Sequence, residues 1–237
     1  MSEEKLEPSF VKKDSVSASV ECRLREHFFS ATAIISSTYD PKHITECPRR
    51  MLYRCKGTNY NTGGINKREQ EANRNRIWEW ITLFRACKGI RVHDTELSVS
   101  DCKYNLVGKL DFVIGIKDTL LATVVHSVDN DSFLKIQEKG AIRKDVIELM
   151  VYMWLTELSD GLIIYENRNN FEYTTFHIKP YKPIINSVIK KCKMLDKHEV
   201  EATMPDRPYK TKDESECIQC EYWKECWQLA NKQEIRI

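Results

Sequence analysis

Residues 105–118 read NLVGKLDFVIGIKD, and the residues that follow, 119–129, read TLLATVVHSVD. Both runs are rich in β-branched residues and are punctuated by Gly, Asn or Asp, so they predict two consecutive strands. A third run of the same kind, TELSVSD, lies just upstream at residues 95–101. Together the three runs predict an antiparallel meander at the centre of the fold.

Helices are predicted on both sides of this meander. Apolar residues recur at helical spacing, or turn signals bound the run, in four stretches: residues 43–55 (with a start at Asp40-Pro41 and an end at Gly57), 67–89, about 143–156 (stopped by Gly161) and 182–195. Residues 57–64 are predicted to form a loop, and residues 161–170 and 172–181 two further strands. The order predicts an α/β protein with a central mixed sheet flanked by helices.

The chain has 237 residues, of which 41% are hydrophobic, enough for one substantial core. We predict a polar N-terminal arm over residues 1–29, one domain over residues 30–228 and a C-terminal tail over residues 229–237. The formal net charge of +2 does not by itself indicate a nucleic-acid-binding protein, so any basic surface would have to be local.

Three cysteines near the C-terminus, Cys217, Cys220 and Cys226, form a C-x2-C-x5-C run. Three thiolates leave a four-coordinate site one ligand short, and Cys47, beside the helix opened by Pro48, is the natural fourth. One inorganic centre would then join the N- and C-terminal segments of the domain. Ligand chemistry alone leaves zinc and an iron–sulfur cluster equally open.

The other cysteines show no pairing pattern, and the total of nine is odd, which argues against a disulfide framework. The opening residues, MSEEKLEPSFVKKDS, are charged and lack the apolar core of a signal peptide. The longest apolar runs, such as LLATVV, are too short to span a bilayer. These features predict no membrane association and a reducing, cytoplasmic setting, which is the host cytoplasm if the chain is phage-encoded.

Four stretches resemble the RecB-type nucleases of the PD-(D/E)xK fold, in particular their iron–sulfur branch. The stretches are ECPRRMLY, GKLDFVI, ELMVY with GLIIYENRN, and the C-terminal cysteine triplet. That branch includes RecB-like exonucleases of CRISPR adaptation, the AddB nuclease domain and phage-encoded exonucleases. The resemblance covers roughly residues 30–228 and implies a PD-(D/E)xK nuclease-like fold. It also implies a [4Fe–4S] cluster, with structural zinc as the alternative, on Cys47, Cys217, Cys220 and Cys226.

The resemblance implies an active site that is incomplete in this chain. Relatives use two carboxylates to hold Mg²⁺ or Mn²⁺, and a lysine to position the attacking water. Asp111 lies where the first carboxylate belongs, but Val124 and His126 stand at the glutamate and lysine positions of the E-x-K motif. Trp78 stands where many relatives have a further histidine ligand. Valine cannot bind a cation, and a histidine of ordinary pKa is mostly neutral at pH 7.

This pattern favours a catalytically degenerate nuclease fold with Asp111 as the surviving site residue. Rescue remains open, because Glu148 stands at the glutamine of the relatives' Q-x-x-x-Y motif and could act as a migrated carboxylate. Further donors would be Glu79, Glu96 and Asp129. The alternative is therefore an active exonuclease that uses Mg²⁺ or Mn²⁺ with Asp111 and Glu148, His126 being inactive.

Residues that could contact DNA are Arg49, Arg50 and Tyr152, although basic residues more commonly form a solvated surface and Tyr152 could equally be a core aromatic. The leading hypothesis is a non-enzymatic protein of DNA replication, recombination or defence that binds single-stranded or end-bearing DNA or a protein partner. A pure interaction protein without nucleic-acid contact is a third hypothesis. The aromatic residues Tyr222, Trp223 and Trp227 are expected to shield the cysteine site.

Overall fold

The computed structural model describes residues 38–55 and 67–229. The expected arm 1–29, the expected loop 57–64 and residues 230–237 of the expected tail lie outside the described residues. The elements are η1 (Pro41–His43), α2 (Pro48–Cys55), α3 (Lys67–Ala86), β1 (Ile90–Asp101), β2 (Leu106–Ile116), β3 (Thr119–Val128), α4 (Asn130–Lys139), α5 (Arg143–Thr156), β4 (Gly161–Asn167), β5 (Tyr173–Ile178), α6 (Lys182–Val200), α7 (Ser215–Ile218) and the π-helical turn η2 (Glu225–Leu229).

The five strands form one sheet in the order β1-β2-β3-β4-β5. β3 and β4 are parallel and every other neighbouring pair is antiparallel. The parallel pair requires a crossover, which α4 and α5 provide. The mixed sheet and the α/β class are thus as predicted, and the meander comprises β1, β2 and β3.

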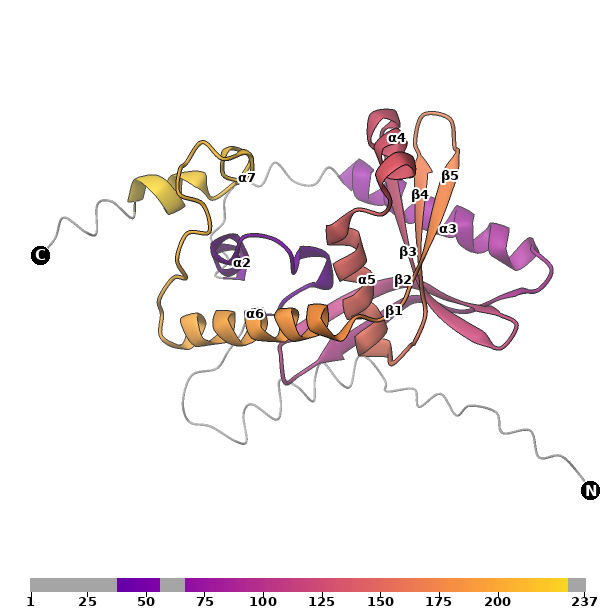
Figure 1. The fold of residues 1–237 in the computed structure, drawn as a ribbon, viewed down its shortest axis with the longest axis horizontal. Coiled ribbons are helices and arrows are strands. Elements are labelled where there is room, and N and C mark those ends of the chain that lie inside the picture. The colour runs from indigo at the N-terminus through magenta and orange to yellow at the C-terminus, as the bar shows by residue number, and fades with distance from the viewer. Residues whose placement is uncertain (1–37, 56–66, 230–237) are drawn as a thin grey trace, which may run out of the picture.

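Helices cover both faces of the sheet (Figure 1). On one face α3 packs Trp80 and Ile81 against Phe112 and Ile114 of β2. On the other face α5 packs its apolar residues against β2, β3 and β4, as in the contact between Leu149 and the core. A third apolar cluster joins α2 and α6 to the residues around η1 on the outer side of α5. Because both faces are covered, the central strands are almost entirely buried.

The helix predicted around residues 143–156 is confirmed as α5, but Gly161 does not stop it. The helix ends at Thr156, and Glu157 adopts the left-handed conformation that commonly terminates helices, with φ 59°. Gly161 instead begins β4, where a Cβ atom would lie 2.6 Å from the sulfur of Met153 and 2.8 Å from a methyl of Leu149. This glycine therefore allows α5 to pack closely on the sheet.

Two other helix predictions need correction. The helix expected over residues 43–55 is split, with a 3-10 turn at η1 and a separate helix α2 that begins at Pro48, whose ring favours the first helical position. The sequence reading also missed α4. Asp129 caps that helix by accepting a hydrogen bond from the Ser132 N–H at 2.9 Å, and Gly140 ends it with φ 91°.

Part of the described chain that precedes α2 is fixed against β2. Tyr39 forms a parallel bridge with Leu106, in which the Tyr39 N–H donates to Asn105 O at 2.7 Å and Val107 N–H donates to Tyr39 O at 3.0 Å. Next along the chain, Pro41 sits over Gly108, where a Cβ atom would lie 2.6 Å from Pro41 Cδ. Gly108 thus forms the notch that receives η1.

We predict that Gly108→Ala displaces η1 and lowers stability by about 1–3 kcal/mol, because the added methyl meets both Pro41 and the ring of buried Tyr152. Thermal unfolding of the two proteins measures the loss. The matched control is Gly115→Ala in the same strand, where the nearest atoms belong to the exposed side chain of His93, which can rotate away. Equal unfolding temperatures for the two variants would contradict the role assigned to Gly108.

Among the described cysteines, Cys102 is disulfide-bonded and seven others are free. The irregular spacing of the cysteines did not predict a bond at this position. Within the described ranges, the structure contains no helix with the length and apolar character needed to cross a bilayer.

Candidate metal centre

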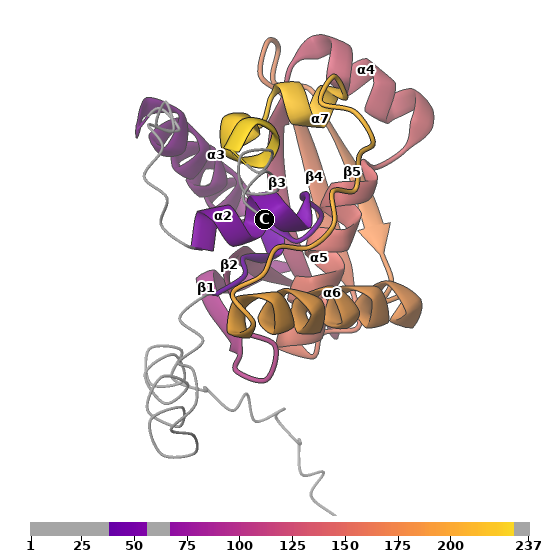
Figure 2. The same ribbon diagram turned by 90° about the vertical axis from the view of Figure 1, so that its left-hand side faces the viewer.

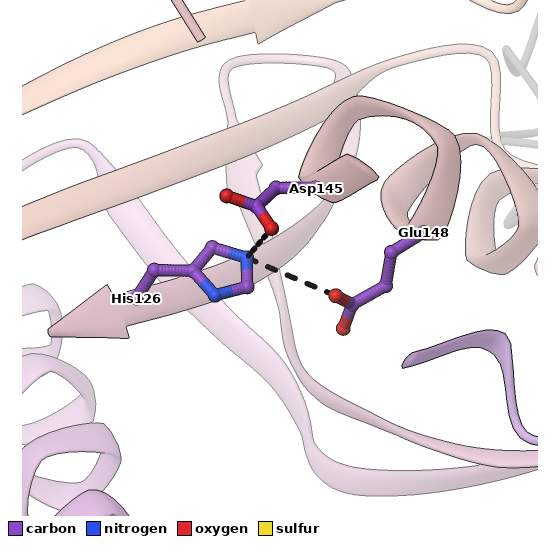
Figure 3. Close-up of side chains that lie close together, drawn as sticks. All are labelled: His126, Asp145 and Glu148. Carbon is purple, nitrogen blue, oxygen red and sulfur yellow. Dashed lines mark ion pairs between the residues drawn. The ribbon is translucent and has the colours of Figure 1, made fainter. Parts of the chain in front are cut away.

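A histidine and two carboxylates meet between β3 and the first turns of α5 (Figure 3). His126 Nε2 lies 4.0 Å from Asp145 Oδ1 and 3.9 Å from Glu148 Oε2. The strand presents His126, while Asp145 and Glu148 are three residues apart and therefore lie on one face of the helix. The side chains of both acids are less than a tenth exposed.

A hydrogen-bonded tyrosine orients Asp145 toward the histidine. The Tyr165 hydroxyl donates to Asp145 Oδ2 at 2.8 Å and accepts from the Ile142 N–H at 3.0 Å. Asp145 Oδ1 is then the oxygen that faces His126. A fixed outer partner of this kind holds a ligand carboxylate in one orientation.

The spacing of these three groups fits a divalent cation. Two ligands that are each about 2.1 Å from a cation lie about 3.0 Å apart when adjacent and about 4.2 Å apart when opposite. The two measured separations fall inside this range. His126 Nε2 and Glu148 Oε1 are moreover buried atoms without a hydrogen-bond partner, which is costly unless another species binds them.

Asp111 of β2 lies at the edge of this group. Its Oδ2 accepts a hydrogen bond from the Val125 N–H at 2.9 Å, and its Oδ1 lies 3.7 Å from the ammonium of Lys42 in η1. Burial raises the pKa of Asp111 above its ordinary value, against the opposing effects of Lys42 and the Val125 N–H. The charge of Asp111 also acts on His126 and Glu148, so Asp111 lies close to this group.

Burial dominates the protonation of the other members. It raises the pKa of Glu148 to about 8, and the neighbouring Asp111 and Asp145 reinforce the shift while Lys42 opposes it. Burial also lowers the pKa of His126, although Asp145 and Asp111 oppose that shift. At neutral pH His126 is therefore an uncharged imidazole with a free lone pair, and Glu148 in the metal-free protein retains its proton.

The other residues that the sequence offered as site residues lie outside this group. Val124 is buried in the apolar core, and Trp78 is 38% exposed on α3. The further candidate donors have other roles or positions: Glu96 accepts from Lys109 at 3.1 Å, Asp129 caps α4, and Glu79 is exposed on α3.

Asp145 is the site residue that the sequence reading missed. A signal for it was present, because Asp145 and Glu148 are two acids at i and i+3 in a helix that is otherwise largely apolar. Such a pair on a buried helix face needs a partner, since unpaired carboxylates are rarely buried. The residue opposite this pair, His126, follows only from the packing of α5 on the sheet.

A second candidate centre lies in a cavity between α2, α6 and the C-terminal segment, and this cavity extends to the first turn of α5. Cys47, Cys217, Cys220 and Cys226 all line one cavity of about 630 Å³, together with the aromatic residues Tyr222, Trp223 and Trp227. Figures 1 and 2 show the yellow C-terminal segment beside α2, which follows Cys47. Burial raises the pKa of Cys217 and Cys220, and among the described residues no three of the four sulfur atoms lie within 4.8 Å of one another.

Direct contacts also fasten this C-terminal segment to α2. Arg50 and Arg54 each form ion pairs with Glu46 and with Glu221, of which the Arg50–Glu221 pair measures 2.7 Å. The rings of Tyr53 and Tyr222 are stacked with centroids 5.4 Å apart. Arg50, which was predicted as a DNA contact, is thus already paired with two carboxylates.

The other two predicted DNA contacts are placed differently. Arg49 lines the cysteine cavity, and its buried Nε has no hydrogen-bond partner. Tyr152 lies on α5 and is fully buried, so its ring is not available to stack on a base. Two exposed cations that the sequence reading did not single out, Arg143 and Lys144, begin α5 immediately before Asp145 and line the same cavity.

Solved structures with a similar fold include several nucleases. The crystal structure of SSO0001 superposes with a TM-score of 0.53 at 14% identity, covering 87% of this chain and 93% of that one. LHK-Exo in complex with dAMP has a TM-score of 0.50 at 13% identity, covering 70% and 90%. A phage-related exonuclease from Haemophilus somnus 129PT has a TM-score of 0.50 at 17% identity, covering 65% and 80%.

No family model and no curated protein matches this sequence. At these identities the likeness establishes the fold alone. The chain therefore has a mixed-sheet α/β fold that is shared with exonucleases, and its chemistry has to be inferred from its own residues.

Proposed function

We propose that this chain is a divalent-metal-dependent nuclease that acts on DNA ends through a rearranged active site. The observation that carries the proposal is the convergence of His126, Asp145 and Glu148 beside Asp111, in a fold shared with exonucleases. The resemblance did not predict that His126 or Asp145 would be a metal ligand. The rearrangement compensates for Val124, which occupies the usual glutamate position.

The donor set supports Mn²⁺ as the preferred cation. Carboxylates suit Mg²⁺ and Mn²⁺ alike, but an imidazole ligand is better suited to a transition metal. A bound cation in such a site polarises a phosphoryl oxygen and lowers the pKa of a coordinated water. The protein contributes the neutral His126 lone pair, the Asp145 oxygen fixed by Tyr165, and a mostly buried setting that strengthens electrostatic interactions.

DNA is the proposed substrate, in single-stranded or end-bearing form. The LHK-Exo structure contains dAMP, a nucleotide, which supports a nucleic-acid ligand for a shared fold. In this chain the exposed Arg143 and Lys144 flank Asp145 at the start of α5, where they can contact phosphates without reading sequence. The near-neutral overall charge is consistent with a basic surface confined to this region.

We also propose a [4Fe–4S] cluster on Cys47, Cys217, Cys220 and Cys226, in a structural role. Four thiolate donors around one cavity are the donor chemistry that such a cluster needs. The resemblance to the iron–sulfur relatives favours the cluster over zinc, and thiolate ligands of this kind suit a reducing, cytoplasmic compartment.

A second candidate function is a DNA- or protein-binding factor of replication, recombination or defence that has lost hydrolysis. The observation in its favour is Val124, a buried core residue at the position where relatives have their second carboxylate. In this case His126, Asp145 and Glu148 would bind a cation without catalysing hydrolysis, or Glu148 would simply keep its proton.

One experiment decides between the two candidates. Protein purified without oxygen is incubated with end-labelled single-stranded DNA and Mn²⁺, and nucleotide release is followed on gels. We expect Mn²⁺-dependent release that falls at least about 100-fold in Asp145→Asn and in Asp111→Ala. Glu138→Gln, an exposed carboxylate on α4, is the matched control and should retain full activity.

Other outcomes of the same experiment would favour the second candidate function or overturn the cluster. Wild-type protein that leaves DNA intact in Mn²⁺ and in Mg²⁺, yet binds it with an affinity that falls as salt rises, would establish the non-enzymatic candidate. The same preparation tests the cofactor: a brown protein with iron and sulfide supports the cluster, whereas a colourless protein with stoichiometric zinc would overturn it.

A further inference from the structure

A short segment, far from the strands of the site along the chain, places a cation beside the site. Tyr39 to Glu46 is fixed at its start by the bridge between Tyr39 and Leu106. At its other end the Lys191 ammonium of α6 donates to Ile44 O at 2.7 Å and also to Glu46 O. The turn η1 between these anchors rests in the notch over Gly108. Lys42 is therefore presented from a rigid support.

The head of Lys42 lies beside the carboxylates and is open to solvent. Its Nζ is 3.7 Å from Asp111 Oδ1, and 45% of its side chain is exposed, whereas only 7% of the Asp111 side chain is. The second oxygen of Asp111 is already occupied by the Val125 N–H. Because 3.7 Å is longer than a good hydrogen bond, the ammonium retains donors for another acceptor.

We propose that Lys42 binds a phosphate oxygen of DNA in this site, in place of the strand lysine whose position His126 occupies. The inference rests on the proposed function and names the residue that would hold the substrate there. A phosphate that reaches the group formed by His126, Asp145 and Glu148 has to approach over its exposed edge. Lys42 is the cation that the structure places next to Asp111 on that edge.

The charge state of Lys42 is suited to this role. Burial lowers the pKa of its ammonium, but Asp111 and Glu148 more than offset the effect and raise the pKa above its ordinary value. A permanently charged ammonium cannot accept a proton from water, so the group serves to bind and neutralise phosphate charge. His126 cannot do so, because burial keeps it neutral.

The test compares Lys42→Met with Lys109→Met. Lys109 is the matched control, since its side chain is similarly exposed, at 53%, and its ammonium pairs with Glu96 at 3.1 Å, away from the site. Binding of a labelled 12-nucleotide single strand is measured at several salt concentrations with Ca²⁺ present, and nucleotide release is measured with Mn²⁺. We expect Lys42→Met to reduce the slope of log affinity against log salt by about 0.7.

Nucleotide release should fall about 100-fold in the same variant, while Lys109→Met keeps the wild-type slope and rate. Lys42→Arg, which retains the charge, should restore the slope. A slope that is unchanged in Lys42→Met, an equal loss in Lys109→Met, or a wild type that does not bind the strand would each overturn the assignment. The two proposals are tested separately. If the wild type does not cleave DNA, the proposed function is wrong. The salt dependence of binding still tests whether Lys42 contacts a phosphate.

Discussion

Glu148→Gln should make the metal-free protein more stable at pH 9 while it removes the high-affinity site for Mn²⁺. Burial raises the pKa of Glu148 to about 8 in the folded chain, from an ordinary value of 4.5. Between these two values the folded state holds a proton that the unfolded state releases, so stability falls as pH rises through this window. Above about pH 8 the full cost of a buried carboxylate is present, and glutamine avoids it.

The expected gain at pH 9 is about 2 to 5 kcal/mol, and it should disappear at about pH 3, well below the ordinary pKa of 4.5, where both states are protonated. Thermal unfolding of metal-free protein at the two pH values measures this difference. Mn²⁺ affinity, measured by calorimetry, should fall by more than about 10-fold, because even the loss of an outer partner of a ligand has that effect.

The matched control for this experiment is Glu138→Gln, which changes an exposed glutamate of α4 in the same way. It should alter neither the pH dependence of stability nor the affinity for Mn²⁺. If Glu148→Gln destabilises the metal-free protein at pH 9, the carboxylate has a favourable partner there and the assignment as a cation ligand is wrong.

Cys220→Ser should release the C-terminal segment and abolish the proposed [4Fe–4S] cluster. The four-cysteine site would close a loop of about 170 residues between Cys47 and Cys217, and closing a loop of that length is worth about 5 kcal/mol. Its loss should lower the unfolding temperature by about 10–20 °C or leave the protein insoluble. Absorbance in the visible range and iron content report the cofactor independently of stability. Cys47→Ser and Cys226→Ser should behave alike.

The comparison for these variants is Cys87→Ser, which changes an exposed free cysteine at the end of α3. It should retain the visible spectrum, the iron and the unfolding temperature. Equal loss of cofactor in Cys87→Ser would show that other cysteines bind the cofactor. A Cys220→Ser protein with unchanged stability would mean that the ion pairs of Arg50 and Arg54 with Glu221 suffice to hold the segment.

Sequence patterns predicted the fold where local signals and tertiary packing agree. The strands β2 and β3 are continuous apolar runs because both of their faces are covered, and α5 has the length and composition of a buried helix. The missed helix α4 has mixed polarity, since only Phe133 and Ile136 are buried, so its periodicity is weak. Its signals were the cap at Asp129 and the glycine at position 140.

The candidate site was only partly predictable. The resemblance pointed to Asp111, His126 and Glu148, but it led us to regard His126 as inactive. Its use as a ligand depends on Asp145, which lies on another element. The sequence showed Lys42 only as part of a basic stretch, because its approach to Asp111 depends on the notch at Gly108 and on a bridge between distant segments.

The anchoring of η1 by Lys191 has a consequence for how the protein matures on the ribosome. Residues 39–46 are synthesised first among those described, yet their last turn is secured by a side chain of α6, some 145 positions later. A nascent chain that has already made the sheet and α5 therefore still lacks a fixed Lys42. Any capacity to engage nucleic acid through that residue would arise only after α6 has emerged, late in translation.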